Sequence, residues 1–244
     1  MVFGHESAAP RPVTGVLCYY RRVREFELVV SEVAAVGGLV QVQCEGPDPG
    51  ADPGQVCLAL AQRLAPAGPA WLRVSLHLAP REGGATFYAP LTHAYARLQP
   101  GDRLEMLGPI GRGFRLPSGG AHLLALASSL ERLLPTLLHA LRLGLAVTVM
   151  TPRSADLLPA DVEIHRGPLS AELAAWADGV VLDVADPRTR AKHIRELAPP
   201  RGEGFVQALF QGLLPCGVGA CQACWVEPAQ TKKLLCVEGP VFGL

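Results

Sequence analysis

The chain has 244 residues, and its 22 basic and 22 acidic side chains give a formal net charge of zero at pH 7. That balance, without a dense basic run, argues against binding to nucleic acid or to an anionic membrane surface. No apolar stretch approaches the roughly 18 residues of a membrane-spanning helix, and no N-terminal signal pattern is present. Since 49% of the residues are hydrophobic, the chain can bury a substantial core. We therefore expect a cytoplasmic protein.

The first half of the chain has the pattern of an all-β domain. Residues 1–12 carry little pattern and are expected to form a loose arm. Short apolar or alternating runs at 26–30, 39–43 and 72–78 then lie between turn-forming Gly and Pro residues, with one helical turn expected at 91–98. Closely spaced short strands of this kind predict an antiparallel β-barrel, closed so that no strand edge is left unpaired.

The periodicity changes after Gly119-Gly120. Strands are predicted at 123–127, 145–150 and 180–184, helices at 129–143 and 188–197, and a further strand and helix over 162–177. Strands that alternate with helices indicate a parallel α/β sheet of the nucleotide-binding type. We expect a barrel domain at 1–118, a nucleotide-binding-like domain at 119–208 and a cysteine-rich segment at 209–244.

That last segment holds the densest chemical signal of the chain. Cys216, Cys221 and Cys224 have the C-x4-C-x2-C spacing of a plant-type [2Fe-2S] loop, and Cys236 supplies a fourth thiol. Gly217 can adopt the positive φ angle that folding a loop tightly round a cluster requires. The pattern predicts that these four cysteines hold a [2Fe-2S] cluster and that the chain transfers electrons one at a time.

Two other uses of the cysteines stay open. Structural zinc also takes four cysteines, but usually through two short C-x2-C units, of which this segment has one. Disulfides are disfavoured in a chain with an odd number of cysteines, seven, and no signal pattern. We expect Cys18, Cys44 and Cys57 to pack as small apolar side chains. The seven histidines show no ligand spacing, and no hydrolytic or phosphotransfer motif is present, so no catalytic residue is assigned.

The order of these parts resembles the electron-transfer subunit of dihydroorotate dehydrogenase, which is itself similar to ferredoxin reductases. The resemblance is carried by the motifs Pro-Gly-Gln-Val at 53–56, Leu-Gln-Pro-Gly-Asp-Arg-Leu at 98–104, Gly-Pro-Ile-Gly-Arg-Gly-Phe at 108–114 and the cysteine loop with residues 236–242. It implies FAD in the barrel, a nicotinamide site on the α/β sheet and a [2Fe-2S] centre. It also implies a flavin-bearing, dihydroorotate-oxidising partner chain in a heterotetramer of pyrimidine biosynthesis, on which the activity of this chain would depend.

The flavin motifs depart from the family pattern. The family's Arg-x-Tyr/Phe-Ser motif is reduced to Arg73-Val74-Ser75, without its aromatic residue and the proline before it. The family's glycine pair before a threonine is replaced by Ala89-Pro90-Leu91, ahead of Thr92. The resemblance assigns FAD binding to Arg73, Ser75 and Thr92. An ordinary strand with no flavin role stays open, because side chains at 89–91 would crowd a phosphate that normally lies against bare N–H groups.

The nicotinamide motifs are weaker still. The turn after the strand at 123–127 reads Ser128-Ser129-Leu130-Glu131, with no glycine. Ser128 and Glu131 have the spacing of a capping box, in which the side chains of the helix itself occupy the N–H groups that would bind a phosphate. The family's later Cys-Gly-Pro is Ala-Asp-Pro at 185–187. We therefore expect NAD binding to be lost.

The sequence leaves three functions to compare. The first is an iron-sulfur electron-transfer subunit that works with a flavoprotein catalytic chain, as the resemblance implies. The second is a degenerate reductase that serves as an iron-sulfur scaffold in another redox complex, and the third is a structural zinc module.

Overall fold

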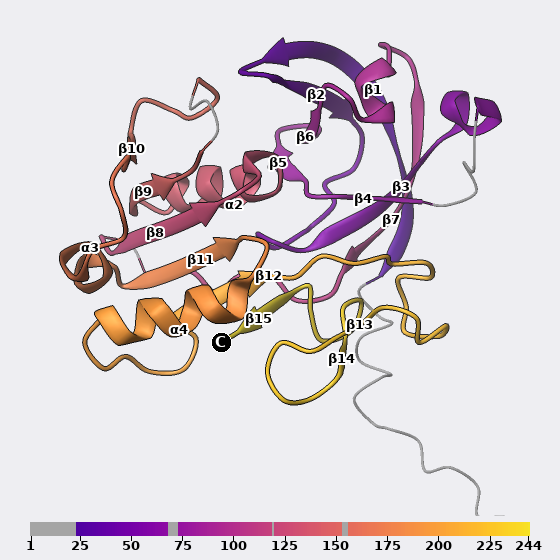
Figure 1. Ribbon diagram of the computed structural model, residues 1–244. Coiled ribbons are helices and arrows are strands. Elements are labelled where there is room, and N and C mark those ends of the chain that lie inside the picture. The colour runs from indigo at the N-terminus through magenta and orange to yellow at the C-terminus, as the bar shows by residue number, and fades with distance from the viewer. Residues whose placement is uncertain (1–22, 68–72, 119, 153–155) are drawn as a thin grey trace, which may run out of the picture.

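The computed structural model describes residues 23–67, 73–118, 120–152 and 156–244 (Figure 1). The predicted arm at 1–12 and Cys18 lie outside these residues. Within them, no helix is long and apolar enough to cross a lipid bilayer. The chain forms an antiparallel β-domain, a parallel α/β domain and a cysteine-rich C-terminal segment, so the predicted fold class is confirmed.

The N-terminal domain is a seven-stranded antiparallel sheet in the order β4-β3-β7-β1-β2-β6-β5. Its strands are β1 (Arg24–Val36), β2 (Leu39–Glu45), β3 (Val56–Ala61), β4 (Val74–Leu76), β5 (Ala79–Arg81), β6 (Gly84–Pro90) and β7 (Arg103–Ile110). The sheet curls round fully buried side chains that include Leu28, Val42, Phe87 and Leu104. Cys44 belongs to the same core, as does Cys57, so both pack as predicted.

This sheet is a half-barrel rather than the closed barrel that we predicted. Its edge strands β4 and β5 are separated by only two residues in the chain, yet no described ladder pairs them. The reason is length, because each of these strands has only three residues. The predicted strand at 72–78 is therefore reduced to β4, and residue 72 lies outside the described part. The expected helical turn at 91–98 is the short 3-10 helix η2 (Ala94–Arg97), and a second one, η1, spans Gln62–Ala67.

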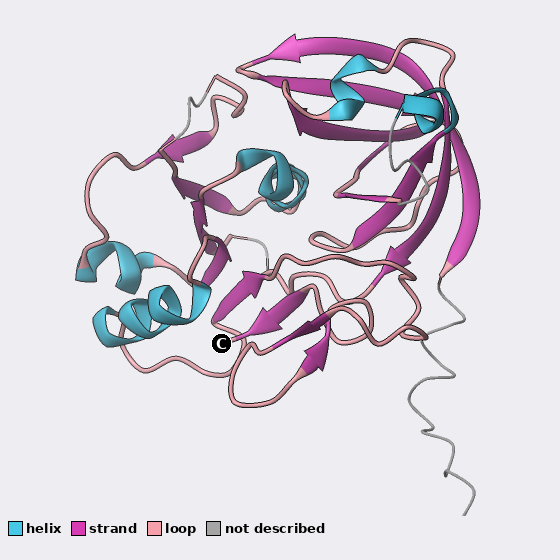
Figure 2. Ribbon diagram, turned by 45° about the vertical axis from the view of Figure 1, so that its right-hand side comes forward, coloured by secondary structure: helices cyan, strands magenta, loops and turns pink. Residues whose placement is uncertain are grey.

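The second sheet has the order β10-β9-β8-β11-β12-β15 and is parallel except for β15. Its strands are β8 (His122–Ala127), β9 (Ala146–Met150), β10 (Val162–Ile164), β11 (Gly179–Asp183), β12 (Val206–Leu209) and β15 (Val241–Gly243). The helices are α2 (Leu130–Arg142), α3 (Ala171–Trp176) and α4 (Pro187–Leu197). Helix α2 packs with Leu123 and Ala125 on one face of β8, whereas α4 packs with Leu124 and Leu126 on the other (Figure 2). Burial on both faces explains the continuous apolar runs of these strands.

The C-terminal segment packs against both domains. Its short strands β13 (Trp225–Val226) and β14 (Lys233–Leu234) form a hairpin, and β15 pairs with β12 at the edge of the parallel sheet. Leu214, Leu235 and Phe242 share a buried cluster with Val56 and Ile110 of the half-barrel. The segment is therefore held by apolar contacts on one side and by strand pairing on the other.

The motif at 108–114 explains how the segment is held so closely. A Cβ on Gly111, whose φ is +77°, would lie 1.9 Å from the carbonyl oxygen of Gly239. The next residue, Arg112, donates its backbone N–H to that same carbonyl. Only glycine allows the two backbones to approach to this distance, so the motif joins the half-barrel to the residues that follow Cys236.

Candidate metal centre and nucleotide-binding edge

The hairpin of β13 and β14 brings two of the four predicted cysteine ligands together. Trp225 pairs with Leu234, and the N–H of Leu235 donates to the carbonyl of Cys224 at 3.0 Å. Cys224 and Cys236, which flank this pairing, have their sulfur atoms 3.3 Å apart. Both side chains are buried, with exposed fractions of 4% and 0%. Residues twelve positions apart thus form one thiol pair.

The loop between Cys216 and Cys224 turns tightly in front of this pair. Gly217 and Gly219 have φ angles of +68° and +77°, and Gln222, at +51°, has the only positive φ among the described non-glycine residues. A Cβ on Gly217 would lie 2.7 Å from the side chain of Ile110, so the loop is packed closely against the half-barrel. Cys216, at the start of this loop, is half-buried, and Cys221 is exposed.

Backbone N–H groups of the loop point at these sulfur atoms. Burial acts to raise the pKa of Cys216, but the N–H groups of Cys221, Val218 and Ala220 and the Cys221 thiol outweigh it and lower that pKa to about 7. Burial, together with Cys224, raises the pKa of Cys236 to about 12, against a backbone hydrogen bond from Gly219. A thiolate at Cys236 therefore needs a cation beside it, and a coordinated metal supplies one.

The four candidate thiol ligands differ in how closely they approach one another. Among the described residues, no group of three or more His, Cys, Asp or Glu side chains is arranged to hold one metal ion. Cys224 and Cys236 form the one thiol contact among these four described cysteines, with their sulfur atoms 3.3 Å apart. A tetrahedral zinc site needs four thiolates round one point, whereas a [2Fe-2S] cluster divides four ligands between two irons.

Of the three predicted flavin residues, only Ser75 lines one of the two described cavities. The Arg73 guanidinium lies 3.8 Å from the Glu25 carboxylate and donates to the Glu105 carbonyl at 3.3 Å. Thr92 is exposed in the turn after β6. The described cavity beside Ser75 has a volume of about 200 Å³, below the about 300 Å³ at which typical cofactor pockets begin. The structure thus adds no support for FAD beyond Ser75, and the flavin assignment stays a prediction.

That cavity holds a buried histidine which sequence reasoning did not select. The Nδ1 atom of His77 is buried and has no hydrogen-bond partner among the described residues. Burial, followed by the charge of Arg132, lowers the pKa of His77 to about 4, against a backbone hydrogen bond with Gln55. His77 is therefore neutral at pH 7, and it lies between the half-barrel and the C-terminal segment, beside Leu235.

The edge of the parallel sheet where a dinucleotide would bind is occupied by an ion pair. Arg132, in the first turn of α2, donates through Nε to Asp183 at 2.8 Å, and Gln211 donates to the other oxygen of that carboxylate at 2.9 Å. Asp183 ends β11 and is fully buried. Its burial raises the pKa of Asp183, and Arg132 opposes that rise.

The predicted capping box at Ser128 and Glu131 is wrong. The N–H of Ser128 donates to the Asp183 carbonyl at 2.8 Å, so Ser128 is hydrogen-bonded to the end of β11. Helix α2 therefore begins one residue later, with Ser129 as its N-cap. Glu131 lies 3.4 Å from Arg132 instead of reaching back to the helix start. At the second predicted turn, the Asp186 side chain caps α4 by accepting the Thr189 N–H at 3.1 Å. The carboxylates of Asp183 and Asp186 therefore lie at and just after the carboxyl end of β11, the end of the strands at which ligands bind in open α/β sheets.

The comparisons with known proteins agree with the cysteine geometry. A family model described as the iron-sulfur cluster binding domain of dihydroorotate dehydrogenase B matches residues 212–244. A relative from Desulforamulus reducens, the electron transfer subunit of dihydroorotate dehydrogenase B (NAD(+)), is 24% identical in an alignment that covers 69% of this chain and 76% of that one.

Solved structures share the fold at low identity. An NADH-dependent reduced ferredoxin-NADP oxidoreductase has a TM-score of 0.57 at 16% identity, with 88% of this chain and 87% of the other covered. A ferredoxin reductase of carbazole 1,9a-dioxygenase gives 0.56 at 18% identity over 76% of this chain and 67% of the other. An Amycolatopsis cytochrome P450 reductase gives 0.56 at 17% identity, over 76% and 69%. These similarities show a ferredoxin reductase-like fold.

Proposed function

We propose that this chain is a distant relative of the dihydroorotate dehydrogenase B electron-transfer subunits and serves as the iron-sulfur electron carrier of a flavoprotein dehydrogenase. In this proposal Cys216, Cys221, Cys224 and Cys236 hold a [2Fe-2S] cluster. The observation that carries it is the buried contact of Cys224 with Cys236, 3.3 Å apart, within the residues 212–244 that match the iron-sulfur cluster binding domain.

The bound cluster would supply one-electron oxidation and reduction. The protein would hold it through four thiolates and through the N–H groups of Val218, Gly219 and Ala220, which stabilise negative charge on sulfur. Burial of Cys224 and Cys236 keeps water from one side of the site. Exposure and hydrogen bonding to the ligand sulfurs are among the features that set the potential of such clusters.

The partner would bind on the exposed side of the cysteine loop. Cys221 is exposed, and two large apolar side chains of the same segment are also exposed, Leu213 at 78% and Trp225 at 49%. Exposed apolar side chains beside a redox site are typical of a surface that a partner covers. By its family, the partner is a flavin-bearing catalytic subunit that oxidises dihydroorotate, in a hetero-oligomer.

We infer that electrons reach this chain from the partner and not from NADH bound on the chain itself. The buried Arg132–Asp183 pair and the Asp186 cap support this inference, because each takes up a group that would otherwise contact a pyrophosphate. No organic substrate is assigned to the chain alone. The acceptor to which it passes the electrons is a separate protein or cofactor.

Reconstitution tests this function. The anaerobically purified chain is mixed with a dihydroorotate dehydrogenase B catalytic subunit, dihydroorotate is added, and bleaching of the visible iron-sulfur absorption is followed. We expect bleaching that requires both the partner and dihydroorotate, and that is lost in Cys224→Ser but kept in Cys44→Ala, which removes a buried thiol elsewhere. A loaded cluster that the partner never reduces would instead support the scaffold function, and a colourless zinc protein would support the structural module.

A further inference from the structure

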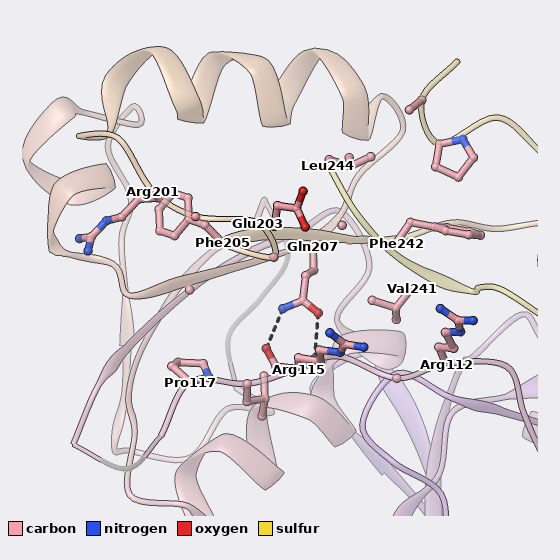
Figure 3. A pocket seen from close by; sticks show the side chains of 18 of the residues that line it. Arg112, Arg115, Pro117, Arg201, Glu203, Phe205, Gln207, Val241, Phe242 and Leu244 are labelled. Atoms are coloured by element: carbon pink, nitrogen blue, oxygen red, sulfur yellow. Dashed lines mark hydrogen bonds between the residues drawn. The ribbon is translucent and has the colours of Figure 1, made fainter. Parts of the chain in front are cut away.

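The larger of the two described cavities lies at the amino-terminal ends of β11 and β12, whereas the Arg132–Asp183 pair lies at the carboxyl end of β11. It has a volume of about 800 Å³ (Figure 3). One wall is the segment at 112–117 that links the two domains, a second is formed by the residues that begin β11 and β12, and a third belongs to the C-terminal segment. None of the predicted cysteine or flavin residues lines it, so it is a separate site.

Positive charge is concentrated in this cavity. Its cationic side chains are those of Arg112, Arg115, Arg195, Arg201 and Lys233. In the described part of the chain, no Asp or Glu side chain forms an ion pair with any of the five. Four of them, all but Arg195, thus lie around one cavity without an anionic partner, in a chain whose net charge is zero.

Three of these cations are held in place by other groups of the chain. Arg195 donates at 2.9 Å to an oxygen of Leu244, the last residue, where that oxygen belongs to a carboxylate, whereas the other two contact neutral groups. Arg201 donates to the carbonyls of Ala175 and Ala177 at 3.0 and 3.1 Å and lies over the ring of Phe205. Lys233 lies 5.9 Å from the centre of the Phe242 ring. Carbonyls and aromatic faces orient a cation without cancelling its charge.

The other two cations, Arg112 and Arg115, have free guanidinium groups on a fixed backbone. Neither side chain makes a hydrogen bond or an ion pair with the described residues, and both are exposed. The backbone beneath them is held by Gln207, which accepts the Arg115 N–H at 2.8 Å and donates to the Arg115 carbonyl at 2.7 Å (Figure 3). The buried Gln207 amide therefore positions this part of the wall.

The cavity has fewer carboxylate side chains than cationic ones, and two of the three accept hydrogen bonds from other residues. Asp178 accepts the N–H of His122 at 3.0 Å and contacts its ring at 3.2 Å, while Glu238 accepts the N–H of Leu234 at 3.2 Å. Glu203 makes no such bond and lies across the cavity from Arg115 (Figure 3). Against the five cations, these three carboxylates and that of Leu244 still leave the cavity with a positive excess.

From this geometry we propose that the cavity binds a small, multiply charged oxyanion, held chiefly by Arg112 and Arg115. A guanidinium presents parallel N–H donors that match phosphate and carboxylate oxygens. A volume of about 800 Å³ suits a metabolite of nucleotide size, and a cleft lined by one sign of charge raises the local concentration of the opposite sign. The proposal does not depend on the electron-transfer function, because no cysteine takes part in it.

Calorimetric titration of the full chain tests the site, with pyrophosphate as the phosphate probe and citrate as the carboxylate probe. We expect saturable binding of at least one probe, weakened about tenfold or more by Arg112→Ala/Arg115→Ala. The matched control, Arg188→Ala/Arg190→Ala, removes the same charge from exposed positions near the start of α4 that do not line the cavity, and should leave the affinity within about twofold. Whichever probe binds more tightly identifies the anion class.

Glu203→Gln supplies a test of sign. Removal of this carboxylate should tighten binding of the same probe, because it would repel an anion held at Arg112 and Arg115. Absence of saturable binding for both probes would overturn the proposal, as would equal losses in the two arginine double variants. Far-UV circular dichroism and the visible absorption spectrum of each variant show that the fold and the cluster segment are unchanged.

Discussion

Replacement of Arg132 by methionine should be among the most destabilising changes in the α/β domain. The change removes the guanidinium from Asp183, whose carboxylate is fully buried and would keep only the bond from Gln211. Loss of one partner from a buried ion pair costs about 3–5 kcal/mol. Because the Arg132 side chain is 26% exposed and Gln211 remains, we expect the lower end, about 3 kcal/mol. That is a large part of the about 5–15 kcal/mol by which a domain is stable.

The double variant Arg132→Met/Asp183→Asn tests the cause of that loss. Asparagine has almost the shape of aspartate but carries no charge, so the unpaired buried carboxylate disappears. We therefore expect the double variant to recover at least about half of the stability lost in Arg132→Met, measured by urea unfolding followed by circular dichroism at neutral pH. A loss below about 1 kcal/mol in the single variant, or a double variant that is less stable than the single, would refute this account of the sheet edge.

Three further predictions follow from single residues. Gly111→Ala should lower the free energy of unfolding by more than about 2 kcal/mol, because the added Cβ would meet the Gly239 carbonyl. The control Gly101→Ala, at φ +91° with nothing within 4 Å of the added Cβ, should lower it by only about 1 kcal/mol. Similar losses in the two variants would contradict the close approach of the backbones at Gly111. The folded-state pKa of His77, about 4, lies below its unfolded value of about 6.5, so the wild type should lose up to about 3 kcal/mol as the pH falls through that interval. His77→Gln should lack this loss. If the free energy of unfolding of the two proteins instead changed in parallel with pH, the low pKa of His77 would be contradicted. Cys224→Ser should remove most of the bound iron while Cys44→Ala keeps it, as metal analysis after anaerobic purification can show.

Strands and helices with a clear apolar pattern could be predicted from the sequence. The apolar runs of β8, β9 and β11 and the helical periodicity of α2 and α4 led to the α/β domain, and the glycines of the cysteine loop have the positive φ angles that their positions suggested. The parallel strand β12 and the antiparallel β15 were not predicted. β15 becomes a strand only because β12 offers a free edge.

Long-range partners were beyond local reasoning. Ser128 has the sequence of a helix cap, but its N–H is bonded to Asp183, 55 residues later in the chain, and the helix start moves by one residue. The ion pair of Arg132 and the cationic cavity likewise depend on segments that meet only in the folded chain. An aspartate that ends an otherwise apolar strand, as Asp183 does, is the one sequence signal that could have indicated the occupied edge.

Electron paramagnetic resonance of the anaerobically purified, dithionite-reduced chain, combined with iron and sulfide analysis, tests the central claim most directly. The spacing of the four cysteines predicts two irons and two sulfides per chain and the signal of a reduced [2Fe-2S] cluster. A spectroscopically silent protein that contains zinc, or no metal at all, would contradict the proposed function.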